Sequence, residues 1–131
     1  MNWARLIRTA LAARERAYAP YSSFRVGAAL LARSGEVYVG SNVENASYGL
    51  CICAERVAVT KAVTAGEKGF LALAVATQSS PPSPCCGMCL QTLVEFADEL
   101  PIVLINPDGG RVDTALQTLF PASFTRRLLE S

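Results

Sequence analysis

The sequence has 131 residues and contains no histidine. This absence excludes Ser-His-Asp and Cys-His catalysis within the chain, and it excludes imidazole as a metal ligand or as a proton carrier near neutral pH. Any acid–base chemistry must therefore use a carboxylate, a thiol, an amine or a phenol. Any tightly bound transition metal must be held mainly by thiolates, which the five cysteines can supply.

The sequence also lacks a charge imbalance and a long apolar run. The formal net charge of +1 gives no electrostatic basis for binding nucleic acid or an anionic membrane. Apolar stretches such as Phe70–Thr77 have the length of a strand and are too short to span a bilayer. Residues 1–18 do not resemble a secretory signal, and an odd number of cysteines does not suit a disulfide framework. We therefore expect a cytoplasmic protein whose partners include neither membrane nor nucleic acid.

The length fits a single domain over residues 1–131, since domains of about 100–150 residues are the commonest. The predicted elements, in chain order, are a helix over 2–17, strands over 24–32 and 36–41, a helix over 53–65, a strand over 70–77, a helix over 87–99 and a strand over 102–105. Residues 106–110 read as a turn, and the tail beyond them has short helical or irregular stretches. The last two helices each connect two strands, which is typical of parallel crossovers. We expect an α/β fold, a three-layer α/β/α sandwich with a mixed central sheet of about five strands.

The cysteines form two groups, and each group lies where a predicted helix begins. Cys51 and Cys53 precede the helix at 53–65, and Cys85, Cys86 and Cys89 lie at the start of the next. A helix N-terminus favours thiolates through its free N–H groups and its positive dipole. Three thiolates and a water form a catalytic zinc site, whereas a fourth cysteine would close a structural one. Inert or redox-active cysteines are the third alternative that the spacing leaves open.

Glu55 lies two residues after Cys53, in the first turn of its predicted helix. An acidic residue in this position commonly interacts only with the helix dipole. Beside a zinc-bound water, the same carboxylate could accept the proton of that water and pass it on. Glu55 therefore favours the catalytic alternative.

Four separated motifs are distinctive: Cys53-Ala54-Glu55-Arg56, Cys86-Gly87-Met88-Cys89-Leu90-Gln91, Pro20–Ala29 and Asn42–Gly49. Together they resemble the small homotetrameric cytidine deaminases of pyrimidine salvage. They occur in the family's order, and the resemblance extends from the first helix to Phe124. It implies zinc-dependent hydrolytic deamination of cytidine and of 2'-deoxycytidine to uridine or 2'-deoxyuridine and ammonia.

The resemblance also implies the roles of the residues around the metal. Cys53, Cys86 and Cys89 would hold one Zn²⁺ per chain, and Glu55 would move protons while zinc-bound hydroxide attacks C4 of the pyrimidine. Arg56 and Gln91 would surround the ligands. Arg56 matters because three thiolates and Zn²⁺ leave one net negative charge, which opposes ionisation of the water. Without the resemblance, Arg56 would be interpreted as a surface residue of a helix.

The substrate-binding residues that the resemblance implies are Phe24, Asn42, Glu44, Ala46, Tyr48, Ala54 and Phe124. Asn42 and Glu44 would fix ribose hydroxyls, and the backbone of Ala54 would orient the base. Taken alone, Asn42 and Glu44 would be turn residues, and the two phenylalanines would be core residues.

A homotetramer is the assembly that the resemblance implies. Ala46, Tyr48 and Phe124 match positions that reach the site of a neighbouring subunit. The composition agrees with self-association, because 51% of the residues are hydrophobic and the mean hydropathy is +0.28, more than one small core requires.

Two positions depart from the family's pattern. Cys85 stands where the family has proline, and Leu90 stands where it has arginine. Gly87 and Gln91 fix the register, so Cys86 is preferred as the ligand and Cys85 remains an alternative. Two rival functions also stay open: a binding protein with a closed four-cysteine zinc site, and a deaminase of a nucleoside antibiotic or of free cytosine.

Overall fold

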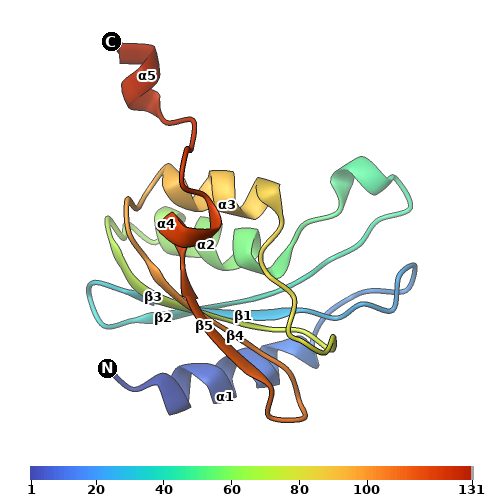
Figure 1. Ribbon diagram of the computed structural model, residues 1–131. Helices are drawn as coiled ribbons and strands as arrows, with labels where there is room; N and C mark the ends of the chain where they lie inside the picture. The colour runs from blue at the N-terminus through green and yellow to red at the C-terminus, as the bar shows by residue number, and fades with distance from the viewer. Residues whose placement is uncertain (131) are drawn as a thin grey trace.

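A mixed sheet of five strands forms the middle layer of the computed structural model, which describes residues 1–130 (Figure 1). The elements are α1 (Trp3–Arg14), β1 (Gly27–Ala32), β2 (Val37–Ser41), the 3₁₀ helix η1 (Tyr48–Leu50), α2 (Ala54–Thr64), β3 (Phe70–Ala76), α3 (Gly87–Val94), β4 (Pro101–Ile105), β5 (Arg111–Ala115), α4 (Leu116–Leu119) and α5 (Arg126–Glu130). The strand order is β2-β1-β3-β4-β5, with β3 and β4 parallel and the other neighbours antiparallel. The predicted α/β fold with a mixed sheet is confirmed.

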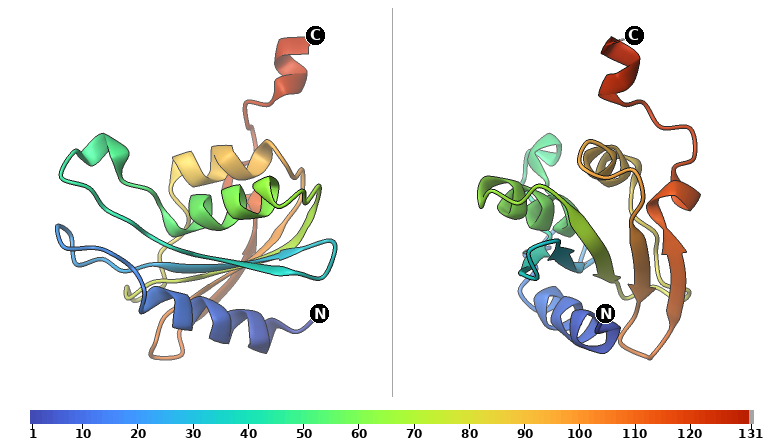
Figure 2. Two further views of the ribbon diagram at one scale, coloured as in Figure 1. Left: turned by 180° about the vertical axis from the view of Figure 1, so that it is seen from behind. Right: turned by 90° about the vertical axis from the view of Figure 1, so that its left-hand side faces the viewer.

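Helices cover both faces of the sheet, α1 on one face and α2 and α3 on the other (Figures 1 and 2). The strand β3 shows how its residues divide between the two layers. Leu73 and Val75 belong to the core cluster that includes α2 and α3, whereas Ala72, Ala74 and Ala76 belong to the cluster beneath α1. Since strand side chains alternate between faces, the small alanines let α1 lie close to the sheet. This explains why the β3 sequence is apolar without a gap.

The strands β2 and β3 run in the same direction, because both are antiparallel to β1 between them. The chain continues from β2 toward α2 and from β3 toward α3, so both helices begin at the same edge of the sheet. Figure 1 shows these two helix starts at one end of the molecule, beside the projecting segment that contains η1. The fold therefore brings the two cysteine groups together.

Several boundaries differ from the predicted ones for local reasons. The first helix ends at Arg14, because the next N–H groups bond three residues back, as those of Arg16 and Ala17 do. β1 begins at Gly27, three residues later than predicted, because the backbone just before it bonds to a side chain, described below, in place of a neighbouring strand. The third long helix ends at Val94, five residues early.

The last strand, β5, was not predicted from its own residues. Most of the residues at 111–115 are polar, and most are exposed, so the segment lacks the apolar alternation that indicates a strand. They pair with β4 across the turn that was predicted at residues 106–110. In the part of the chain that the structure describes, no helix has the length and apolarity needed to cross a membrane.

Gly40 permits the close contact between β2 and the start of α2. A Cβ atom added there would lie 2.1 Å from the carbonyl oxygen of Ala54 and 2.7 Å from the backbone nitrogen of Ala58. Both atoms belong to the backbone, so the helix itself would have to move. Gly40 is therefore required for the position of α2, and with it for the position of Cys53.

We expect Gly40→Ala to lower the free energy of unfolding by about 2 kcal/mol, the usual cost of overpacking. Chemical denaturation measures this change. Gly49→Ala is the matched control, because a Cβ at Gly49 would meet nothing within 4 Å. Equal stability of the two variants would contradict the close contact.

Candidate functional site

Three cysteine sulfur atoms meet where α2 and α3 begin. Cys53 is the N-cap of α2, Cys86 is the N-cap of α3, and Cys89 lies in the first turn of α3. The Sγ atom of Cys86 is 3.7 Å from that of Cys53 and 3.4 Å from that of Cys89, and all three lie within 4.8 Å of one another. The structure therefore brings together the three ligands preferred in the sequence.

Two positive groups lie beside the Cys53 sulfur, the Arg56 guanidinium and the N-terminus of α2. The Arg56 guanidinium donates from Nη2 to Cys53 Sγ at 3.8 Å and to the Cys51 carbonyl oxygen at 3.1 Å. A hydrogen bond from the Cys89 thiol, together with Arg56, lowers the pKa of Cys53 to about 5. The α2 N-terminus adds its own positive dipole. The local environment therefore favours a thiolate at Cys53.

The three thiols fit a Zn²⁺ ion by their chemistry and their arrangement. Thiolates are the ligands that zinc prefers where no imidazole is available, and three protein ligands leave a fourth tetrahedral position open. Arg56 Nε is buried without a hydrogen-bond partner among the described residues, next to these sulfurs. An anionic metal–thiolate centre would place negative charge beside this partly buried cation.

Glu55 lies beside the thiols and is 5% exposed. Burial raises the pKa of Glu55, because desolvation disfavours its charged form, and the negative charge on Cys53 adds to the effect. Cys85 is buried as well, and its thiol hydrogen-bonds Glu55. Cys85 therefore faces the carboxylate and stands apart from the three-thiol group, which supports the choice of Cys86 as ligand.

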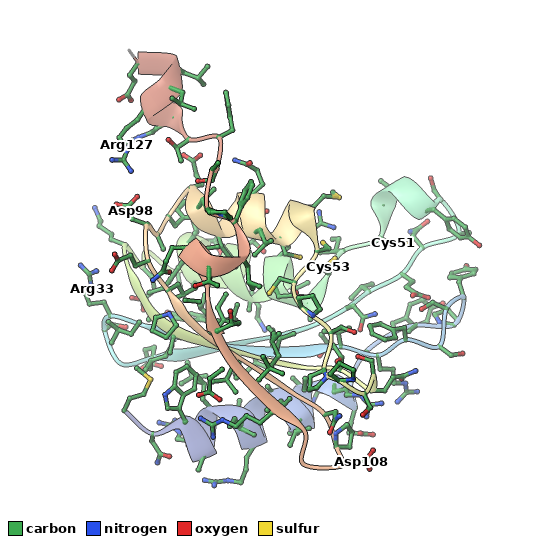
Figure 3. All side chains as sticks on the ribbon, viewed as in Figure 1. Arg33, Cys51, Cys53, Asp98, Asp108 and Arg127 are labelled. Carbon is green, nitrogen blue, oxygen red and sulfur yellow. The ribbon has the colours of Figure 1, made fainter. Side chains whose placement is uncertain are left out.

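A cavity of about 330 Å³ opens beside this group. It is lined by Ser22, Phe24, Val26, Asn42, Glu44, Cys51, Ile52, Cys53, Glu55, Val75, Thr77, Ser83, Pro84 and Cys86. Figure 3 shows Cys53 at the start of α2 and Cys51 just before it, at the base of the projecting segment. One end of the cavity thus carries thiols and the buried carboxylate. Two projecting loops, residues 18–26 and 42–52, form another part of its wall.

Asn42 and Glu44 join the two loops that line the cavity. The Asn42 amide accepts a hydrogen bond from the backbone N–H of Val26 at 2.8 Å and donates to the carbonyl oxygen of Phe24 at 2.9 Å. The Glu44 carboxylate accepts from the backbone of Tyr21 and Ser22 and from the Ser22 hydroxyl. The bond from the Ser22 hydroxyl lowers the pKa of Glu44, so the carboxylate stays ionised at neutral pH.

The other predicted site residues lie outside the lining of this cavity. Ala54 is buried at the start of α2. Ala46 and Tyr48 lie on the projecting loop, and the Tyr48 side chain is 74% exposed. Phe124 lies in the C-terminal tail, where its carbonyl oxygen accepts a hydrogen bond from Nε2 of Gln91 at 2.7 Å. This bond joins the Gln91 side chain to the tail, and its expected place around the metal ligands stays a prediction.

Sequence reasoning did not find several of the lining residues. Thr77 follows β3 directly, and its hydroxyl accepts a hydrogen bond from the backbone of Ser83 at 3.1 Å. Residues at the carboxyl ends of parallel strands commonly line ligand sites, and that rule could have selected Thr77. Ser22 carried a weaker signal, because a serine in a turn more often serves the turn alone.

A zinc-binding enzyme with a buried carboxylate is the class that this fold and site define. A family model described as "Cytidine and deoxycytidylate deaminase zinc-binding region" matches residues 1–104. The cytidine deaminase of Sporosarcina psychrophila is 43% identical over 127 residues, covering 96% of this chain and 93% of that protein. The cytidine deaminase of Halalkalibacterium halodurans is 45% identical and covers 92% of each.

The solved structures agree with the sequence matches. The crystal structure of cytidine deaminase from Burkholderia pseudomallei superposes with a TM-score of 0.91 at 47% identity, covering 95% of this chain and all of that one. The chain therefore belongs to the cytidine and deoxycytidylate deaminase family. The family's zinc-binding region and the three-thiol group together support the predicted cofactor, one Zn²⁺ per chain.

We expect Cys86→Ala to lose bound zinc and Cys85→Ala to retain about one ion per chain, because only Cys86 belongs to the three-thiol group. Metal analysis of the purified variants measures the ratio, with folding checked by circular dichroism. The opposite pattern would make Cys85 the ligand.

Proposed function

We propose that the chain catalyses hydrolytic deamination of cytidine and 2'-deoxycytidine, releasing ammonia. The observation that carries this proposal is a buried carboxylate, Glu55, that lines one cavity with Cys53 and Cys86, two of the three clustered thiols. A nucleoside fits the chemistry of this cavity. Asn42 and Glu44 offer polar groups for a sugar in one part, and Glu55 offers acid–base chemistry for the base in another. The cytidine deaminases among the relatives support the same substrate class.

Glu55 is the proton carrier in this proposal. It accepts one proton from the attacking water and delivers it to N3 of the pyrimidine. It then takes the second proton of the same oxygen and delivers it to the amino group, so the C4–N bond breaks, ammonia leaves and the C4 carbonyl of the product forms. A group in this role must both gain and lose a proton near neutral pH. The raised pKa of buried Glu55 moves the carboxylate toward that range.

The remaining residues position the substrate and balance charge. When bound, zinc supplies the Lewis acid that makes water a nucleophile at neutral pH. Arg56 offsets the charge of the thiolate ligands, and the first N–H groups of α2, including that of Ala54, are available to hold the base. Phe24 provides an apolar wall, and Asn42 and Glu44 take the sugar hydroxyls.

A homotetramer whose subunits complete one another's sites is the assembly that we propose. The projecting loops expose a group of apolar side chains, which comprises Tyr18, Tyr21, Val43, Tyr48, Leu50 and Ile52. The Tyr21 and Tyr48 rings pack edge to face, with centroids 6.0 Å apart, at the end of these loops. Phe124 is 54% exposed on a tail that extends away from the sheet (Figure 2). A neighbouring copy would cover both surfaces.

The thiol chemistry also indicates the cellular compartment in which the reaction takes place. Three metal ligands that must remain reduced thiols suit a reducing compartment, so we propose a cytoplasmic enzyme. Its place in pyrimidine salvage is what the resemblance to the family implies.

We expect the purified protein to convert cytidine to uridine with release of one ammonia per turnover, measured by the loss of cytidine absorbance and by ammonia assay. Glu55→Gln should lower kcat about 10³-fold or more while zinc content is unchanged, because the amide cannot carry the proton. Glu36→Gln, which changes an exposed carboxylate, is the matched control. Full turnover by Glu55→Gln would refute the mechanism.

The assembly has its own test. Light scattering should give four times the chain mass of 13.9 kDa. If Phe124 acts in a neighbour's site, then Phe124→Ala and Glu55→Gln chains, each weakly active alone, should gain activity when they are unfolded and refolded together. Mixed tetramers then contain sites with an intact Glu55 and a neighbour's intact Phe124. A monomer with full activity would exclude the shared site.

A further inference from the structure

The hydrogen-bond capacity of Glu44 is almost fully used within the chain. Each carboxylate oxygen has two lone-pair positions. Oε1 accepts from the backbone N–H groups of Tyr21 at 3.0 Å and Ser22 at 3.1 Å, which fills both of its positions. Oε2 accepts from the Ser22 hydroxyl. Among residues 1–130 no other bond to this carboxylate is present, so a single acceptor position remains, and it is on Oε2.

Ser22 determines where that position lies. The Ser22 hydroxyl oxygen accepts a hydrogen bond from the backbone N–H of Phe24 at 3.0 Å, so its proton is directed at Glu44. Ser22, Phe24 and Glu44 all line the cavity. One hydroxyl thus connects the carboxylate to the aromatic wall and fixes the orientation of Oε2.

The turn that carries Ser22 is held in an uncommon conformation. Ser23 has a φ of +59°, in the left-handed region that residues other than glycine seldom adopt. The Ser23 N–H bonds to the Ala19 carbonyl oxygen at 3.0 Å, and Glu44 supplies the further bonds described above. A backbone in a sparsely populated region persists where its surroundings hold it, and such positions cluster at ligand sites.

We propose that Ser22 is a positioning residue for sugar recognition: its hydroxyl orients Glu44 so that the one remaining lone pair on Oε2 accepts one hydroxyl of the sugar. The inference rests on the proposed function, because it requires a nucleoside in the cavity. It goes further by limiting Glu44 to one sugar hydroxyl and by assigning a role to Ser22.

Steady-state kinetics on cytidine and on its 2'-deoxy, 3'-deoxy and 5'-deoxy analogues test the proposal. We expect Ser22→Ala to raise KM for cytidine on the order of tenfold with kcat nearly unchanged, as for a lost hydrogen bond to a charged group. On the analogue that lacks the recognised hydroxyl, Ser22→Ala should change KM less than about twofold, because the lost contact is absent already. The other two analogues should show the full effect.

Ser34→Ala is a closely matched control. Ser34 also accepts from the backbone N–H two residues on, that of Glu36, and donates to a carboxylate, that of Glu67, but it lies away from the cavity. It should leave KM unchanged for all four substrates. Glu44→Gln is the second variant, and it should show the same selective loss if Ser22→Ala does not fold.

The outcomes separate this inference from the function on which it rests. No turnover of cytidine by the wild-type enzyme would contradict the proposed function. Turnover by the wild-type enzyme, with a Ser22→Ala effect that is absent or equal on all four substrates, would overturn only the role of Ser22. A selective loss of the effect on one analogue would support it and identify the hydroxyl.

Discussion

The whole site depends on β2 and β3 running in the same direction. Each strand leads to a helix that begins beside a cysteine, so the two helix N-termini converge at one edge of the sheet. The convergence concentrates positive dipole where three sulfurs must carry negative charge. Gly40 keeps this arrangement possible, because β2 approaches the backbone of α2 more closely than any side chain would allow.

The absence of histidine determines the electrostatics of this edge. With thiolates as the only soft ligands, the metal centre carries more negative charge than one with an imidazole ligand. Arg56 and the helix dipoles oppose that charge on one side. On the other side lies Glu55, where burial and the negative charge of the neighbouring thiolate both favour the protonated form of the carboxylate. The same thiolate charge that would work against ionisation of a metal-bound water therefore raises the pKa of the proposed proton carrier beside it.

The parts of the molecule that follow regular periodicity could be predicted from the sequence, and the parts formed by loop contacts could not. The buried strand at Phe70–Ala76 was predicted because its apolar run is uninterrupted, and the helix before residue 65 from its helix-forming residues and the closing Gly66. The late start of β1 was missed because it depends on Asn42, sixteen residues away from Val26 in the sequence. Ser22 was missed as a lining residue for the same reason: its partner is Glu44, and the pairing exists only after the two loops meet.

The loop contacts also explain why the end of the cavity proposed for the sugar can be rigid without being part of the sheet. Asn42 and Glu44 bond to the backbone of the facing loop, so the side chains proposed to bind substrate are the ones that hold the loop. A ligand that uses their remaining hydrogen-bond positions meets groups already in place, and little conformational entropy is lost on binding. The cost is that Asn42 cannot change without disturbing the wall it supports, since its loss would leave partly buried backbone groups of Phe24 and Val26 without partners. The backbone groups that Glu44 holds belong to the exposed residues Tyr21 and Ser22, where water can take its place. In the proposed function, recognition of the sugar and the stability of the loop thus depend on the same few side chains.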